Sequence, residues 1–161
     1  MAIVPLPLPV PRRRRNDPAV VLAVAAGGAL GAPARYGMAH LVHVDPGTFP
    51  WATFAINLSG SLVLGVIVVV VARRFPSDRF LRPFVATGFL GAYTTYSTFA
   101  VETVVLAKDG RPGVAAVYAV ASLVAGFAAA AAGIAAGGRF VPRDHEHDDH
   151  GGASDPDVGP G

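Results

Sequence analysis

Five consecutive side chains with hydroxyls form the part of this sequence best suited to chemistry. Residues 91–99 read GAYTTYSTF, and the hydroxyls belong to Thr94, Thr95, Tyr96, Ser97 and Thr98. The run lies near the middle of an apolar stretch, residues 81–107, that is long enough to cross a bilayer. Polar groups are costly at that depth and usually have a functional reason. We therefore interpret the run as the lining of a path for a small ion.

The backbone around this run is expected to be irregular. Gly88 and Gly91 precede it and weaken a helix there. A break frees backbone carbonyls, which in a membrane must find protein groups, water or a cation, and broken helices near the midplane often build ion sites. Tyr96 and Phe99 are three residues apart and share one side of the continuing helix, where their partly positive ring edges can meet an anion. The segment therefore predicts a broken helix beside an anion path.

A second row of polar side chains lies on the preceding apolar segment. Thr53, Asn57 and Ser61 are spaced by four and share one helical face. Asn57 can donate two hydrogen bonds, which suits an anion path. The alternative is interhelical hydrogen bonding, which stabilises membrane bundles by about 0.6 kcal/mol per contact. On the last apolar segment, Tyr118 and Ser122 repeat the spacing of four.

Two charged residues fall within the apolar segments. Arg35 lies about two-thirds of the way along the first, where it either extends to the interface or draws anions toward a vestibule. Glu102 follows Phe99 by one helical turn. It either orients donors through hydrogen bonds or caps the end of its segment near Lys108.

Composition indicates which elements must position these groups. Only 15% of the 161 residues are charged, against about a quarter in soluble domains, and the apolar residues are grouped in blocks. Cysteine is absent, which excludes disulfides and thiolate chemistry. We predict an all-α integral membrane protein with Asp17 capping the first helix and Pro18 beginning it. The four predicted spans cover about 19–41, 49–72, 81–107 and 113–137.

The two ends of the chain are predicted to lie outside the membrane domain, residues 18–138. Residues 1–17 form a basic, Pro-rich arm whose Arg12–Arg15 should attract anionic headgroups. No nucleic-acid partner is expected, because no aromatic or polar platform accompanies the arginines. Residues 139–161 form a tail expected to be disordered, in which HEHDDH either binds zinc or nickel weakly or is simply solvated.

The charges also predict an orientation. Ten Lys or Arg residues fall on one predicted side of the membrane: Arg12–Arg15, Arg73, Arg74, Arg79, Arg82, Arg139 and Arg143. The other side has only Lys108 and Arg111. Because positive charge favours the cytoplasmic side, both termini are predicted to be cytoplasmic in the cell membrane.

Three motifs occur in this order: GGALGAPARYG, FAINLSGSLVLG and GFLGAYTTYSTF. Together they resemble the Fluc/CrcB family of fluoride channels, over about residues 24–138. The resemblance implies small four-helix proteins that pair antiparallel, form two fluoride pores along the dimer interface and export cytoplasmic fluoride passively. It also implies a structural, non-transported sodium ion bound by backbone carbonyls at the break in the third helix, here those of Gly91 and Thr94.

The resemblance also assigns individual residues. Asn57 matches the family's pore asparagine, Ser122 its polar-track serine, and Tyr96 and Phe99 its paired aromatics. Arg35 and Glu102 match the family's first-span arginine and third-span glutamate. Taking these matches together with the hydroxyl rows, the predicted fluoride pore is lined by Asn57, Tyr96, Phe99, Ser122, Thr53, Ser97 and Thr98.

Two departures from the family pattern leave questions open. The family commonly has Phe at the position of Tyr96, so the extra hydroxyl either adds a donor or obstructs the pore. Many members have little Lys/Arg asymmetry and insert in both orientations, whereas the Lys and Arg residues of this chain are concentrated on one predicted side of the membrane. We therefore hypothesise a heterodimer with an oppositely oriented homologous subunit.

Other functions fit the sequence less well. A small multidrug transporter needs a carboxylate in the first span, and this chain has Arg35 there. A hydrolase is not expected, because no Ser-His or Asp-Asp pair falls within the spans. A non-conducting structural subunit stays an alternative.

Overall fold

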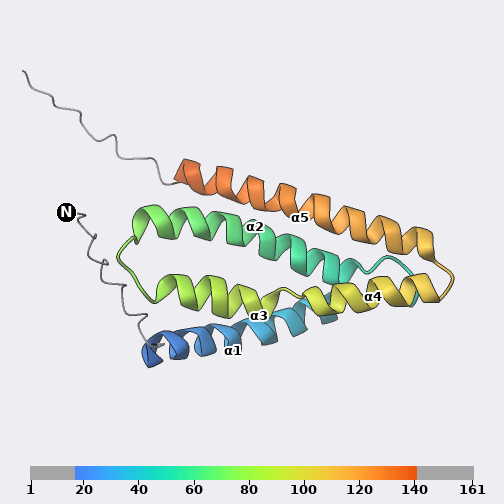
Figure 1. Ribbon diagram of the computed structural model, residues 1–161, viewed down its shortest axis with the longest axis horizontal. Coiled ribbons are helices and arrows are strands. Elements are labelled where there is room, and N and C mark those ends of the chain that lie inside the picture. Colours follow the sequence, from blue (N-terminus) through green and yellow to red (C-terminus); the bar gives the residue numbers. More distant parts are fainter. Residues whose placement is uncertain (1–16, 141–161) are drawn as a thin grey trace, which may run out of the picture.

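Helices account for nearly all of the part that the computed structural model describes, residues 17–140 (Figure 1). Three helices are long: α1 (Pro18–Leu41), α2 (Trp51–Arg74) and α5 (Pro112–Phe140). Between α2 and α5 lie three shorter elements, the π-helix η1 (Pro83–Leu90), α3 (Gly91–Tyr93) and α4 (Tyr96–Lys108). The all-helical prediction is thus confirmed. The predicted arm, apart from Asp17, and the HEHDDH motif lie outside the described residues.

The first helix begins where the sequence predicts. The Asp17 side chain accepts a hydrogen bond from the Ala19 N–H at 3.1 Å, and Pro18 is the first helical residue. An acidic cap satisfies an N–H group that has no partner inside the helix, and proline at this position loses no hydrogen bond.

Three helices of the described part are long and apolar enough to cross a membrane: α1, α2 and α5. Large apolar side chains such as Leu22 and Phe127 are exposed on them, as expected for surfaces that face lipid. The protein is therefore a multi-pass membrane protein. The third predicted span consists instead of consecutive shorter helices, with α3 and α4 running one after the other beside α1 and α2 (Figure 1).

Glycines bring two helix pairs into backbone contact. A Cβ atom on Gly31 of α1 would collide with the carbonyl oxygen of Phe89 in η1, and one on Gly65 of α2 would collide with that of Ala130 in α5. Gly88 also packs against the α1 backbone, with Gly27 as one of its nearest neighbours. Such contacts are how membrane helices pack when no hydrophobic force holds them together.

We predicted that Gly88 and Gly91 weaken the helix, but the helical geometry does not end at either residue. Both residues lie inside the helical run, and Gly91 has φ −63° and ψ −33°. The run continues to Tyr93. Gly88 therefore serves close packing between helices.

Candidate functional site

The backbone leaves helical geometry at two threonines. Thr94 has φ −76° and ψ 161°, and Thr95 has φ −146° and ψ 122°, both extended conformations. They separate α3 from α4. A gap of this kind leaves N–H and C=O groups that need new partners.

The side chain of Asn57, on α2, supplies two of those partners. The Thr95 N–H donates to Asn57 Oδ1 at 2.9 Å, and Asn57 Nδ2 donates to the Thr95 carbonyl at 2.9 Å. We call this pair of bonds the Asn57 clamp. It fixes the gap to the neighbouring helix and leaves the second Nδ2 hydrogen for another acceptor.

A second side chain, that of Thr95 itself, starts the helix after the gap. Thr95 Oγ1 accepts from the Thr98 N–H at 3.1 Å and donates to Thr98 Oγ1 at 2.9 Å. Ser97 Oγ is 3.4 Å from the same oxygen. Thr95 is thus the N-cap of α4. The predicted list of individual pore residues omitted Thr95, and its capping role was not predicted, although a threonine ahead of an apolar run is a recognisable cap signal.

These bonds affect the two carbonyls predicted to hold sodium. In a continuous α-helix the Thr95 N–H bonds the Gly91 carbonyl and the Thr98 N–H bonds the Thr94 carbonyl. Here both N–H groups donate to side chains, Asn57 Oδ1 and Thr95 Oγ1. The Gly91 and Thr94 carbonyls therefore lack the donors that a helix provides. Their role in binding sodium stays a prediction.

A groove of about 390 Å³ runs beside the gap. Its walls come from α2, the η1–α3 run, α4 and α5. Among the residues that line it are six of the predicted site: Asn57, Gly91, Thr94, Tyr96, Phe99 and Ser122. Ser61, Gly60 and Thr95 line it as well. The structure thus brings together side chains that are up to 65 residues apart in the sequence.

A buried hydroxyl and a pair of aromatic rings line the groove. Ser122 Oγ is buried and has no hydrogen-bond partner among residues 17–140. The rings of Tyr96 and Phe99 have centroids 6.1 Å apart and are tilted by 43°. Tyr96 is 81% exposed, so its ring stands at the open side of the groove.

Glu102 lies outside the groove, in a separate polar cluster. Its two carboxylate oxygens accept hydrogen bonds from Thr53 Oγ1 at 2.9 Å and from the Tyr118 hydroxyl at 2.8 Å. Tyr118 is fully buried. Of the two roles predicted for Glu102, this geometry favours orienting hydroxyl groups. The Thr53 hydroxyl donates its proton to Glu102, and Thr53 is not among the residues that line the groove.

The remaining predicted residues lie apart from the groove. Ser97 and Thr98 are exposed on the first turn of α4, beside the Thr95 cap. Arg35 is half-buried on α1 and makes no hydrogen bond or ion pair with the rest of the described chain.

Comparison with known proteins identifies relatives of the chain. A family profile described as CrcB-like protein, Camphor Resistance (CrcB), matches residues 22–134. The chain is 44% identical over 131 residues to the fluoride-specific ion channel FluC 3 of Streptomyces avermitilis, covering 81% of this chain and 64% of that relative. The match therefore spans slightly less than two thirds of the relative's length.

Two further relatives are covered more fully. FluC 2 of Streptomyces avermitilis is 44% identical over 117 residues, or 70% of this chain and 74% of its own length. FluC 2 of Nocardia farcinica is 40% identical over 120 residues, which cover 74% of this chain and 86% of that relative. Both are named fluoride-specific ion channels.

Proposed function

Because this chain belongs to the CrcB family, we propose that it is a fluoride-selective ion channel through which cytoplasmic fluoride leaves the cell passively. Its relatives named FluC are fluoride-specific ion channels, and fluoride is the substrate we assign here. The chain is a channel and not an enzyme.

The observation that carries the proposal is the Ser122 hydroxyl, which has no partner among residues 17–140 and lines the same groove as Asn57. Fluoride is strongly hydrated, so a pore must replace the donors of water at small net cost. Ser122 Oγ–H and the second hydrogen of Asn57 Nδ2 are two such donors in one groove. A buried hydroxyl without a partner costs about 1–3 kcal/mol, and a bound anion removes that cost.

The aromatic pair of the groove supplies a second kind of contact. Tyr96 and Phe99 both line the groove, and the partly positive edges of their rings can attract an anion without a full countercharge. Weak contacts of this kind permit release as well as binding. Ser97 and Thr98 then act indirectly by supporting the Thr95 cap, and the Thr53 hydroxyl is oriented by Glu102.

The Gly91 and Thr94 carbonyls fit a sodium site. Their helical donors are engaged elsewhere, so a cation is a suitable partner for both oxygens. Bound sodium supplies a fixed positive charge near the anion path. Two carbonyls do not enclose a cation, and an antiparallel second subunit that contributes its own pair completes the shell and covers the groove.

The direction of the chain in the membrane follows from its charges. The α1 start, the α2 end and the α5 end lie at one end of the molecule, where five arginines gather: Arg73, Arg74, Arg79, Arg82 and Arg139. We place this end, with both termini, on the cytoplasmic side. A fixed orientation favours pairing with an oppositely oriented homologue. In the orientation that we propose, Arg35 of this chain lies near the outer vestibule.

Fluoride efflux from liposomes tests the function. The full-length protein, alone or with an oppositely oriented homologue, should release fluoride at a rate far above that of empty liposomes. Ser122→Ala should lower the rate about 10- to 100-fold, which corresponds to losing one hydrogen bond to a charged group. It should leave the unfolding midpoint unchanged or raised, because no protein bond is lost.

The control is Ser77→Ala, which removes an exposed loop hydroxyl and should leave efflux unchanged. Wild-type efflux from Ser122→Ala would remove that residue from the path. Absence of fluoride efflux from the protein in both preparations would contradict the channel and favour the structural subunit.

A further inference from the structure

A hollow of about 370 Å³ lies between the end of α2 and the start of η1. Val71, Ala72 and Phe75 form an apolar wall, and Arg79 and Arg82 line the same hollow. We call it the arginine pocket. It lies apart from the groove, at the end of the molecule where the arginines gather.

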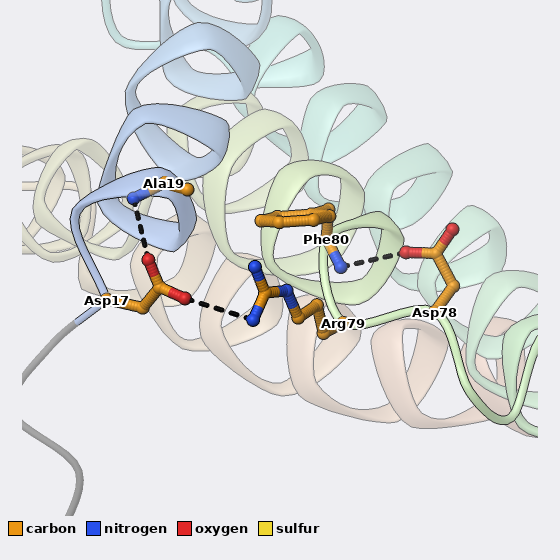
Figure 2. A network of polar contacts seen from close by, with 5 residues as sticks. All are labelled: Asp17, Ala19, Asp78, Arg79 and Phe80. Carbon is orange, nitrogen blue, oxygen red and sulfur yellow. Dashed lines mark hydrogen bonds and ion pairs between the residues drawn. The ribbon is translucent and has the colours of Figure 1, made fainter.

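One of the two guanidinium groups is held in position. Arg79 Nη1 is 3.2 Å from Asp17 Oδ2, and the guanidinium carbon is 4.6 Å from the centre of the Phe80 ring (Figure 2). Asp17 also caps α1 through its other oxygen. Arg79 therefore carries its charge to the pocket in one defined arrangement that links the start of α1 to the loop after α2.

The second guanidinium group is available. Arg82 is exposed and forms no hydrogen bond or ion pair with any residue from 17 to 140. A guanidinium group matches phosphate oxygens with paired N–H donors, which an ammonium group does not provide. Arg82 thus offers the pocket an unused anion-binding group.

The acidic residue of the pocket does not occupy these donors. Asp78 Oδ1 accepts from the N–H groups of Phe80 and Leu81, both at 2.8 Å, as Figure 2 shows for Phe80. Those bonds, that from Leu81 first, hold the pKa of the carboxyl below its ordinary value. Asp78 is therefore ionised and turned toward the backbone. Because Asp17 pairs with Arg79, the guanidinium group of the pocket that no carboxylate from residues 17–140 contacts is that of Arg82.

We propose that the arginine pocket binds the phosphate group of an anionic phospholipid. The pocket combines cations with an apolar wall, and it follows directly after an apolar spanning helix that ends at Arg74. That position corresponds to the headgroup layer, where basic pockets between helices bind anionic headgroups. The exposed rings of Phe75 (45%) and Phe80 (38%) add an apolar contact for a lipid that free phosphate cannot use.

Lipid titration followed by native mass spectrometry tests this proposal. Full-length protein in detergent is titrated with phosphatidylglycerol or phosphatidylcholine, and bound lipid is counted. Wild type should bind phosphatidylglycerol more tightly, and Arg82→Gln should weaken that binding about five-fold, the usual contribution of one basic residue at an anionic surface. Binding of phosphatidylcholine should not change.

The matched control is Lys108→Gln, which removes one exposed positive charge at the opposite end and should leave lipid binding unchanged. Arg82→Lys keeps the charge without the paired donors and should give intermediate affinity. Equal losses in Arg82→Gln and Lys108→Gln, or no loss in either, would overturn the site. Displacement of the lipid by millimolar inorganic phosphate, in an Arg82-dependent manner, would overturn the lipid as its occupant.

Discussion

At the scale of single residues, the interruption between α3 and α4 depends on two side chains. The Asn57 clamp bonds both backbone polar groups of Thr95, and the Thr95 hydroxyl caps α4. Asn57 therefore has a structural role in addition to the pore role we propose. A substitution there changes the backbone as well as the path, so it cannot separate the two.

Thr95→Ala isolates the cap. We expect a loss of about 1 kcal/mol in stability, because Thr98 N–H loses its acceptor while the Asn57 clamp stays. Thermal unfolding of the purified protein in detergent measures the effect. Thr95→Ser keeps the hydroxyl and should behave like wild type; an equal loss in Thr95→Ser would show that the methyl group matters and not the cap.

Much of the groove could be predicted from the sequence, because residue types at helical spacing identify shared faces. The polar row with Asn57 and the aromatic pair Tyr96 and Phe99 were found in this way. The bonding partners could not be predicted. Asn57 and Thr95 are 38 residues apart, and spacing does not reveal which face of α2 meets the gap. The bond between Thr53 and Glu102 could not be predicted for the same reason, since the two residues are 49 positions apart.

At the scale of elements, small residues determine where helices meet. A Cβ atom on Gly60 of α2 would collide with Cγ2 of Thr94, so close contact between α2 and the gap requires glycine. The sequence does not reveal which glycines permit close packing between helices. A glycine that permits close packing and one that weakens a helix look identical in sequence, which is why the predicted break was drawn toward Gly88 and Gly91.

Gly60→Ala should therefore displace Thr94 and destabilise the protein by about 1–3 kcal/mol, the usual cost of overpacking. Thr94→Ser removes the methyl group and keeps the hydroxyl that donates to the Leu90 carbonyl at 3.0 Å. The double variant should recover most of the loss in a double-mutant cycle of unfolding midpoints.

Gly37→Ala is the control, because a Cβ atom there meets no atom within 4 Å. It should leave the midpoint unchanged. Additive losses in the Gly60→Ala/Thr94→Ser variant would show that the two residues do not interact.

At the scale of the whole molecule, the two ends differ in charge. Arg79 contacts Asp17 and Arg73 Nη1 donates to the Gly138 carbonyl at 3.2 Å, so arginines tie the loop and the helix ends together at one end. At the other end Arg111 donates to the Gly47 carbonyl at 2.8 Å. This separation of charge could be predicted from the sequence, because successive loops between spans lie on opposite sides of the membrane.

We expect the chain to insert in one orientation. The chain has no cysteine, so a single substitution introduces a single thiol. Ser77→Cys places that thiol at one end of the molecule, and Asp109→Cys places it at the opposite end. A membrane-impermeant maleimide added to intact cells should label the thiol at 109 and not the one at 77. Equal labelling of both would show dual orientation and remove the reason for a heterodimer.

The interrupted third segment also constrains how the protein is made. Residues 81–93 and 96–108 are each too short to cross a bilayer alone, which takes about 20 residues. The Thr95 N–H and carbonyl at their junction gain their partners only after Asn57 has reached them. We therefore expect the newly synthesised segment to enter lipid together with α2, the helix that supplies these two bonds.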